Sequence, residues 1–127
     1  MYILLDTNAF LWFCEDSRNL SPVAKQYIEN PNNTSFISIA SFWEIAIKIS
    51  LRKMKLRIPF EEFIKLIEEN GFKILSITFE HTVQLSKMEF HHRDPFDRLI
   101  IAQGIVEEQP VISSDSAFDK YEIKRIW

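Results

Sequence analysis

Five short runs of β-forming residues, separated by stretches with helical periodicity, constrain this 127-residue chain more than any other feature. Most of these runs are continuously apolar, which is the pattern of strands that are covered on both faces. Strands that alternate with helices predict an α/β fold in which right-handed crossovers connect parallel strands. The predicted strands are Tyr2–Leu5, Ser35–Ile39, Lys73–Ile77, Pro110–Ser113 and Glu122–Trp127.

Helix signals fill the segments between these strands. Ser21 is a suitable N-cap followed by a proline, and Asp94 opens the last long helix in the same way. Gly71 stands where a helix would end in a left-handed conformation. In the helix expected at Ser41–Leu51, apolar residues cover much of the circumference, which predicts deep burial. The other predicted helices are Phe60–Asn70 and Thr78–Met88.

The length and composition fit one domain. With 127 residues and 46% hydrophobic content the chain can form one compact core, so we expect a single domain over residues 1–127. The one cysteine, Cys14, cannot form an intramolecular disulfide, which fits a reducing cytoplasm. No apolar stretch approaches the ~20 residues that span a bilayer, and no basic segment precedes the apolar start, so neither membrane insertion nor secretion is expected.

Four acidic residues are placed where they could meet at one edge of the sheet: Asp6, Glu44, Asp97 and Asp115. Ligands in parallel α/β sheets bind beyond the carboxyl ends of the strands, and the first and last of these acids each stand just after an apolar strand. Carboxylates gathered there repel one another unless protons or a hard cation such as Mg²⁺ or Mn²⁺ neutralise them. The pattern therefore predicts a metal site suited to phosphodiester hydrolysis.

Each acid also has a purely structural explanation. Asp6 could cap the helix that follows it, Asp97 could interact favourably with the dipole of its helix, and Asp115 could start an Asx turn. Glu44 could form a surface pair with Lys48 one turn later, worth only ~0.3 to 0.5 kcal/mol. Four such positions are harder to explain separately than together, so their joint presence favours metal ligation.

Nearby polar residues are expected to support the acids. These supporting residues are Thr7, Asn8, Asp94 and Ser113. The first two could orient Asp6 by hydrogen bonds, the third caps the helix that carries Asp97, and the last could hold Asp115.

The basic residues give a second, weaker signal. The formal net charge of −3 does not favour a protein that grips nucleic acid through phosphates alone, yet residues 48–57 contain five basic residues and no acid. The candidate nucleic-acid contacts are Lys48, Arg52, Lys53 and Arg98. Basic runs are more often solvated surface, and Arg98 could equally pair with Asp94. His91 and His92 lack zinc-type spacing and are assigned no catalytic role.

Three ordered blocks of sequence make the chain similar to a known family. They are Asp6-Thr7-Asn8-Ala9-Phe10-Leu11-Trp12, Phe42-Trp43-Glu44-Ile45-Ala46-Ile47-Lys48 and His92-Arg93-Asp94-Pro95-Phe96-Asp97-Arg98-Leu99. With Leu99-Ile100-Ile101-Ala102-Gln103 and Val111-Ile112-Ser113-Ser114-Asp115, the likeness covers essentially the whole chain. On these blocks the chain strongly resembles PIN-domain ribonucleases of the VapC toxin type.

The resemblance implies a parallel sheet of about five strands flanked by helices on both faces. It also implies a Mg²⁺- or Mn²⁺-dependent endoribonuclease, a small cognate antitoxin that inhibits it, and a homodimer. The family's acidic metal site falls on Asp6, Glu44, Asp97 and Asp115. Ser113 would take the hydroxyl role usually given to a threonine, and Asn8 stands where many relatives carry histidine.

Three other functions remain open from the sequence. A phosphoacceptor signalling module also binds Mg²⁺ at a sheet edge, but it would need an acidic pair at the first strand and a lysine after the last one, and neither is evident in the sequence. A non-catalytic scaffold of the same fold would use the acids as caps and the apolar helices to bind proteins. A metal-dependent nuclease acting on DNA would use the same chemistry, because nothing in the chain reads a 2′-hydroxyl.

Overall fold

Five strands form one sheet, and they are β1 (Tyr2–Leu5), β2 (Thr34–Ser38), β3 (Lys73–Leu75), β4 (Val111–Ile112) and β5 (Arg125–Ile126). Their order in the sheet is β3-β2-β1-β4-β5 in this computed structural model, which describes residues 1–127, and every neighbouring pair is parallel. β1 lies at the centre and pairs with β2 from Tyr2 opposite Thr34 to Leu5 opposite Ile37. The predicted α/β fold with a parallel sheet is confirmed.

Six α-helices connect the strands, namely α1 (Thr7–Cys14), α2 (Pro22–Glu29), α3 (Ile39–Ser50), α4 (Phe63–Glu69), α5 (Phe79–Lys87) and α6 (Pro95–Val106). Two 3₁₀ segments, η1 (Phe60–Glu62) and η2 (Ser116–Lys120), precede α4 and β5. None of the six α-helices has the length and apolar character that a membrane span requires.

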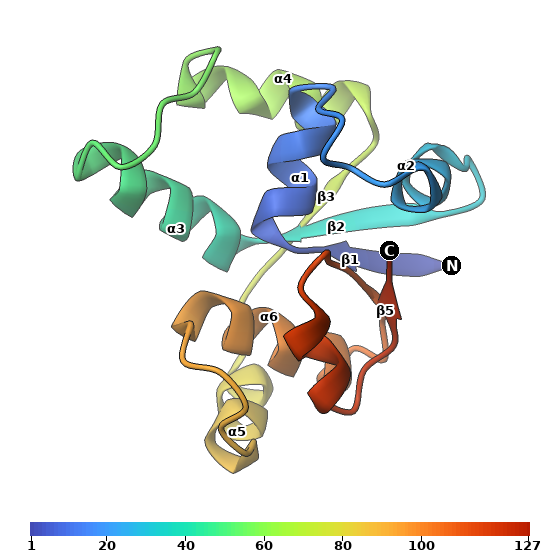
Figure 1. Ribbon diagram of the computed structural model, residues 1–127, viewed down its shortest axis with the longest axis vertical. Coiled ribbons are helices and arrows are strands. Elements are labelled where there is room, and N and C mark those ends of the chain that lie inside the picture. The colour runs from blue at the N-terminus through green and yellow to red at the C-terminus, as the bar shows by residue number, and fades with distance from the viewer.

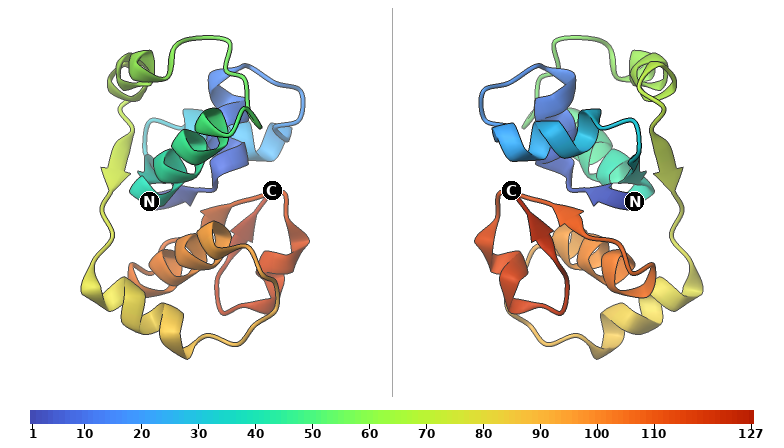
Figure 2. Two further views of the ribbon diagram at one scale, coloured as in Figure 1. Left: turned by 90° about the vertical axis from the view of Figure 1, so that its left-hand side faces the viewer. Right: turned by 90° about the vertical axis from the view of Figure 1, so that its right-hand side faces the viewer.

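Helices cover both faces of the sheet. Figures 1 and 2 show α1 to α4 on one side of the sheet and α5 and α6 on the other. Side chains of β1 alternate between these layers, since Ile3 and Leu5 belong to a buried core of 15 residues and Leu4 belongs to a second core of 6. The continuously apolar sequence of β1 is explained by this double burial.

Local signals set the ends of several helices as predicted, whereas β3, β4 and β5 are shorter than the strands predicted there. Ser21 caps α2 by accepting the Ala24 N–H, and Asp94 caps α6 by accepting two backbone N–H groups. Gly71 follows α4 with φ of 67°, the left-handed conformation expected of it. These positions depend on neighbours in the sequence, which explains why the sequence predicts them well.

Two expectations for the segment around α3 are wrong. Ile39 was expected to end a strand, but it begins α3, because Ser38 accepts the Ala40 N–H and caps the helix there. The helix is also less buried than its apolar circumference predicts. Trp43 is 58% exposed and packs only edge-on against Phe96, with ring centroids 5.3 Å apart, since one face of α3 has no neighbouring element over it.

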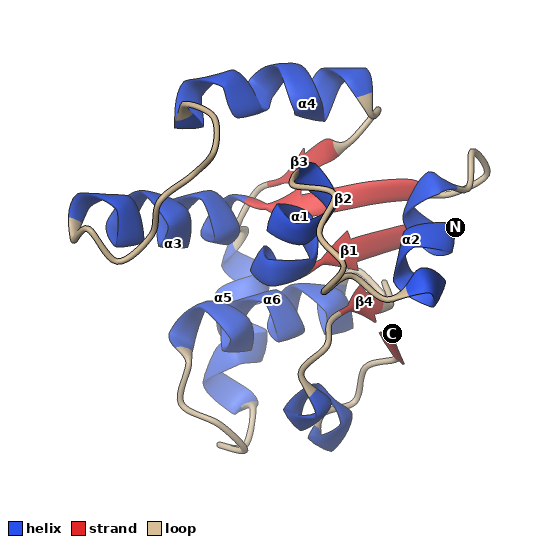
Figure 3. Ribbon diagram, turned by 45° about the horizontal axis from the view of Figure 1, so that its top comes forward, coloured by secondary structure: helices blue, strands red, loops and turns tan.

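The carboxyl ends of the strands meet at one edge of the sheet. Figure 3 shows α1 and α3 starting at the ends of β1 and β2, on the same side of the molecule. The first turn of α6 lies near α3, with which α6 is in contact. The loop after β4 completes this edge, so four separate segments deliver their side chains to it.

Candidate functional site

Asp6 stands at the end of β1 and caps α1. One of its carboxylate oxygens accepts the Ala9 N–H at 2.8 Å, so the capping role considered from the sequence is real. The side chain is nevertheless buried, and burial raises its pKa from 3.8 to about 6. The Ser113 hydroxyl and the Ala9 N–H oppose this rise, while the charges of Asp115 and Glu44 add to it. The cap therefore leaves Asp6 facing other carboxylates.

Glu44 lies on α3 and is almost fully buried, at 5% exposure. The Thr7 hydroxyl donates to its Oε1 at 2.7 Å, and the Lys48 ammonium donates to its Oε2 at 2.7 Å. The pair with Lys48 that was considered from the sequence thus exists, with the Lys48 side chain 42% exposed and only the Glu44 side chain buried. It neutralises Glu44 from one side and raises the pKa of Lys48, chiefly through that hydrogen bond.

Asp97 occupies the third position of α6 and has no hydrogen bond to its carboxylate. Asp94 caps the helix by accepting the Phe96 and Asp97 N–H groups at 2.9 and 3.0 Å. Burial, together with the charges of Asp94, Asp6, Glu44 and Asp115, raises the pKa of Asp97 from 3.8 to about 8. The charge of Asp97 is therefore the least compensated in the group, and four other acids act on it.

Asp115 follows β4 and caps η2, with one carboxylate oxygen accepting the Ala117 N–H at 2.9 Å. The fully buried Ser113 holds this segment, because its hydroxyl accepts the Asp115 N–H at 3.1 Å. Ser113 also acts on Asp6, so one hydroxyl lies between two of the acids.

His92, for which the sequence predicts no catalytic role, lies beside Asp97 and Asp115. One ligand atom from each of these three residues lies within 4.8 Å of the other two. The His92 Nε2 is 3.8 Å from the Asp97 Oδ2 and is buried without a hydrogen-bond partner. Nothing in the spacing of the sequence shows this approach, since it depends on how the loop before α6 folds back.

The four predicted acids therefore share one electrostatic environment, since the charges of Asp6, Glu44 and Asp115 all raise the pKa of Asp97. Only Asp97 and Asp115, together with His92, fall within the tightest group of potential ligand atoms. Buried carboxylates with raised pKa values fit a hard divalent cation, because a dication would replace the protons that relieve their repulsion. The donor set is suited to Mg²⁺ or Mn²⁺.

The supporting residues act differently from what was expected. Thr7 holds Glu44 instead of Asp6, which requires contact between α1 and α3. Asn8 is exposed and its side chain makes no hydrogen bond to Asp6, so the expected orienting role of Asn8 is wrong. Asp94 and Ser113 are both at the site, in the positions described above.

Arg98 requires a correction among the predicted nucleic-acid contacts. Its guanidinium is buried and donates to the carbonyls of Glu89 and Met88 at 2.8 and 3.3 Å, and it stacks 3.9 Å from the centre of the Phe90 ring. It neither pairs with Asp94 nor faces outward, because it pins the loop before α6. Arg52 and Lys53, just after α3, are exposed.

Comparison with known proteins assigns the chain to a family. The family model described as PIN domain matches residues 3–124, nearly the whole chain. No curated protein matches the sequence.

Solved structures with the same fold include complexes of toxins and antitoxins. VapBC2 from Rickettsia felis bound to a promoter DNA fragment is 15% identical, with 98% of this chain and 97% of that chain covered and a TM-score of 0.72. VapBC-1 from nontypeable Haemophilus influenzae is 15% identical over 98% and 96% of the two chains, with a TM-score of 0.70. A toxin-antitoxin complex from Klebsiella pneumoniae is 17% identical over 90% and 87%, with a TM-score of 0.61. At these identities the likeness concerns the fold.

Proposed function

Because this chain belongs to the PIN domain family, we propose that it is the toxin of a type II toxin–antitoxin pair, a Mg²⁺- or Mn²⁺-dependent endoribonuclease that inhibits translation. One observation carries the proposal. Asp6 and Asp97, which are 91 positions apart, are brought to one sheet edge where the pKa of each is raised, to about 6 and about 8. Strongly perturbed acids that gather in this way mark functional sites more often than structural ones.

The carboxylates would hold the metal ion at the edge of the sheet. Asp6, Asp97 and Asp115 offer oxygens, and Glu44 offers its charge while Thr7 and Lys48 keep its side chain in place. A divalent ion at this position supplies a polarised phosphate and an activated water for hydrolysis of the phosphodiester bond. Asp6 and Asp97 would hold the ion in their ionised forms, so any proton that either still carried would be released to solvent.

The substrate would approach across the end of α3. Arg52 and Lys53 are exposed there, and Lys48 lies one turn nearer the acids with its ammonium held by Glu44. Such a path would contact phosphates and read no base, so it sets affinity more than sequence preference. RNA is proposed over DNA because of the family resemblance, and the same edge could cleave either backbone.

An apolar groove between α3, α4 and β3 is the surface proposed for the antitoxin. It has a volume of about 340 Å³ and is lined by Ile39, Phe42, Phe60, Glu61, Phe63, Ile64, Ile67 and Ile74. Three of the isoleucines in it are 41 to 49% exposed, which is costly for a surface without a partner. The fold neighbours from toxin–antitoxin complexes support this partner.

The partner proposal has its own test. A small DNA-binding protein encoded directly upstream should co-purify with this chain and inhibit its nuclease activity. Ile64→Lys should prevent co-purification, whereas Ile77→Lys, outside the groove, should not.

We also propose that the chain forms a homodimer, and light scattering of the purified chain measures its oligomeric state. We propose the cytoplasm as the site of action, because the single cysteine, Cys14, cannot form an intramolecular disulfide, which fits a reducing compartment.

The nuclease proposal is tested with purified protein and a panel of structured RNAs, single-stranded DNA and double-stranded DNA. Each substrate is incubated with Mg²⁺, Mn²⁺ or EDTA, beside Asp6→Asn, Asp97→Asn and the control Asp119→Asn. Metal-dependent RNA cleavage that both site variants lose and the control keeps would support the proposal. Cleavage of DNA but not of RNA would make DNA the substrate in place of RNA. No cleavage by folded, metal-loaded protein would favour the non-catalytic scaffold.

A further inference from the structure

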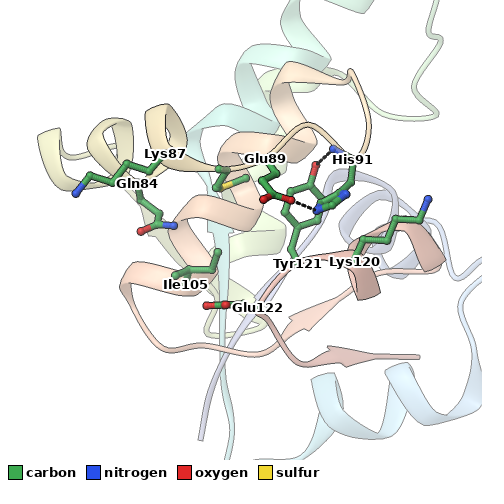
Figure 4. A pocket seen from close by; sticks show the side chains of 9 residues that line it. Gln84, Lys87, Glu89, His91, Ile105, Lys120, Tyr121 and Glu122 are labelled. Carbon is green, nitrogen blue, oxygen red and sulfur yellow. Dashed lines mark hydrogen bonds and ion pairs between the residues drawn. The ribbon is translucent and has the colours of Figure 1, made fainter.

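A network around the Tyr121 hydroxyl fixes the orientation of His92. The hydroxyl oxygen lies 3.2 Å from the His91 backbone nitrogen, 2.9 Å from the His92 Nδ1 and 3.3 Å from an Arg98 guanidinium nitrogen. Figure 4 shows the first of these contacts, at the wall of a pocket of about 310 Å³ that His91 and Tyr121 help to line.

Hydrogen-bond capacity determines which partner receives the Tyr121 proton. A phenolic hydroxyl has one hydrogen to donate and two lone pairs that accept. A backbone N–H and a guanidinium can only donate, so His91 and Arg98 occupy both lone pairs. The remaining contact, with the His92 Nδ1, must therefore be a bond that the hydroxyl donates, and it is also the shortest of the three. The His92 Nδ1 is an acceptor and carries no proton.

The same assignment fixes the other ring nitrogen. A neutral imidazole carries one proton, so with Nδ1 accepting, the proton is on Nε2. This Nε2 is buried, has no hydrogen-bond partner and lies 3.8 Å from the Asp97 Oδ2. The ring lies between Phe118 and Tyr121, with centroid distances of 5.9 and 5.5 Å, so it cannot easily turn away. An N–H that is held by packing thus faces the metal-site carboxylate.

From this geometry we infer that His92 is a positioning residue that donates its Nε2–H to Asp97 and orients that carboxylate for metal binding. The inference rests on the proposed role of Asp97 in the metal centre. The present separation is longer than a hydrogen bond, so the inferred bond requires the Asp97 carboxylate, whose side chain is 23% exposed, to rotate toward the His92 Nε2. His92 is not itself a metal ligand in this arrangement, because a ligand nitrogen needs the lone pair that the Nε2 proton occupies.

The tautomer can be measured directly on the metal-free protein by long-range ¹H–¹⁵N correlation NMR. We expect the His92 Nε2 to show a protonated, pyrrole-type signal and Nδ1 an unprotonated one. Tyr121→Phe removes the only donor to Nδ1 and should mix the two tautomers, while His91→Phe should leave the His92 signals unchanged. A protonated Nδ1 in the wild-type protein would overturn the inference, whatever the nuclease assays show.

The positioning role is measured through Asp97 and through Mn²⁺ binding. His92→Phe should shift the ¹³C signal of the Asp97 carboxyl group and weaken Mn²⁺ binding about 10-fold, the lower end of the cost of losing an outer hydrogen-bond partner. His92→Gln keeps an N–H near the Nε2 position and should recover most of the affinity. An unchanged Asp97 signal in His92→Phe would contradict the role even if the wild type binds no metal. A nitrogen coupling to bound Mn²⁺ in pulsed EPR that His92→Phe removes would make His92 a ligand and also overturn it.

Discussion

Two regions of this molecule hold acidic side chains in opposite ways. At the corner formed by η2 and β5, the exposed Asp119 accepts two hydrogen bonds from Arg125, at 2.9 and 3.0 Å, and these lower its pKa. At the carboxyl edge of the sheet, burial and neighbouring acids raise the pKa values of Asp6 and Asp97 to about 6 and about 8. One region satisfies its charge within the chain, and the other does not.

We interpret this difference as the mark of a sheet edge that receives a cation. A pair such as Asp119 and Arg125 contributes little to folding because water screens it. The edge acids have one nearby ammonium, that of Lys48, and it is hydrogen-bonded to Glu44. Local conflicts of this kind cost stability and persist where function needs them. We interpret the uncompensated charge as a binding site for a divalent metal ion.

The largest expected effect separates the two regions by activity. Asp97→Asn should lower metal-dependent cleavage at least about 100-fold, because even an outer partner of a metal ligand is worth 10 to 100-fold. Asp119→Asn changes the same residue type in the paired region and should leave the rate near that of the wild type. Initial rates on one RNA substrate at saturating metal measure both. Equal losses in the two variants would remove the distinction between the regions.

The second prediction concerns the stability of the metal-free protein as pH changes. The folded state holds the Asp97 proton until pH about 8, whereas the carboxyl group in the unfolded chain loses it near 3.8. Between these values the folded state binds more protons, so the free energy of unfolding should fall as pH rises from 4 to 8, by ~1.4 kcal/mol per pKa unit at most. Asp6 adds to this fall up to pH about 6.

Urea unfolding in EDTA across this pH range measures the fall, and Asp97→Asn should flatten it. Mn²⁺ should restore stability most at pH 8, where the acids are charged. The contribution of Asp119 to the pH dependence of stability has the opposite sign. Because its pKa is lowered in the folded state, its carboxylate stabilises the fold above the unfolded pKa, and this stabilisation is lost in acid. Stability of the metal-free wild type that rises steadily from pH 4 to 8 would contradict the assignment of raised pKa values.

A smaller effect is expected from the residue that joins α1 to α3. Thr7→Val keeps the shape of the side chain but removes the hydroxyl that donates to Glu44. Glu44 would lose one of its two hydrogen bonds, and metal affinity should fall about 10-fold. Isothermal titration with Mn²⁺ measures the change, and Thr82→Val, whose hydroxyl bonds only within α5, is the matched control.

The smallest predicted effect tests the basic surface after α3. Replacing Arg52 and Lys53 together by alanine should weaken RNA binding and lower the slope of log affinity against log salt by about 2, since two phosphate contacts are lost. The cleavage rate at saturating RNA should stay near wild type, because neither side chain contacts the acids. An unchanged salt slope would show that this surface is only solvated.

The sequence predicts well the features that depend on neighbouring residues. It predicts less well the contacts between segments that are far apart in the chain. The caps Ser21 and Asp94 and the left-handed Gly71 follow from local rules and are confirmed. The bond from Thr7 to Glu44 joins residues 37 positions apart, and the contact of His92 with Tyr121 joins residues 29 apart. Such contacts depend on how helices pack, which periodicity does not encode.

Among the candidate site residues, the four acids follow from the rule that parallel strands bring their carboxyl ends to one edge. That rule is general, so the gathering of the acids could be predicted. The prediction that Arg98 contacts nucleic acid is wrong for a different reason. Residues that are adjacent in a helix face different directions, so Arg98 does not share the direction of Asp97. Its guanidinium turns back to the loop carbonyls of Met88 and Glu89.

The most direct test of the central claim is an equilibrium Mn²⁺ titration at pH 8, with free Mn²⁺ measured by EPR. We expect saturable binding by the wild type and by Asp119→Asn, and binding weakened at least about 10-fold in both Asp6→Asn and Asp97→Asn. Binding that is equally tight in all four proteins, or absent from the folded wild type, would contradict a metal centre at this edge of the sheet.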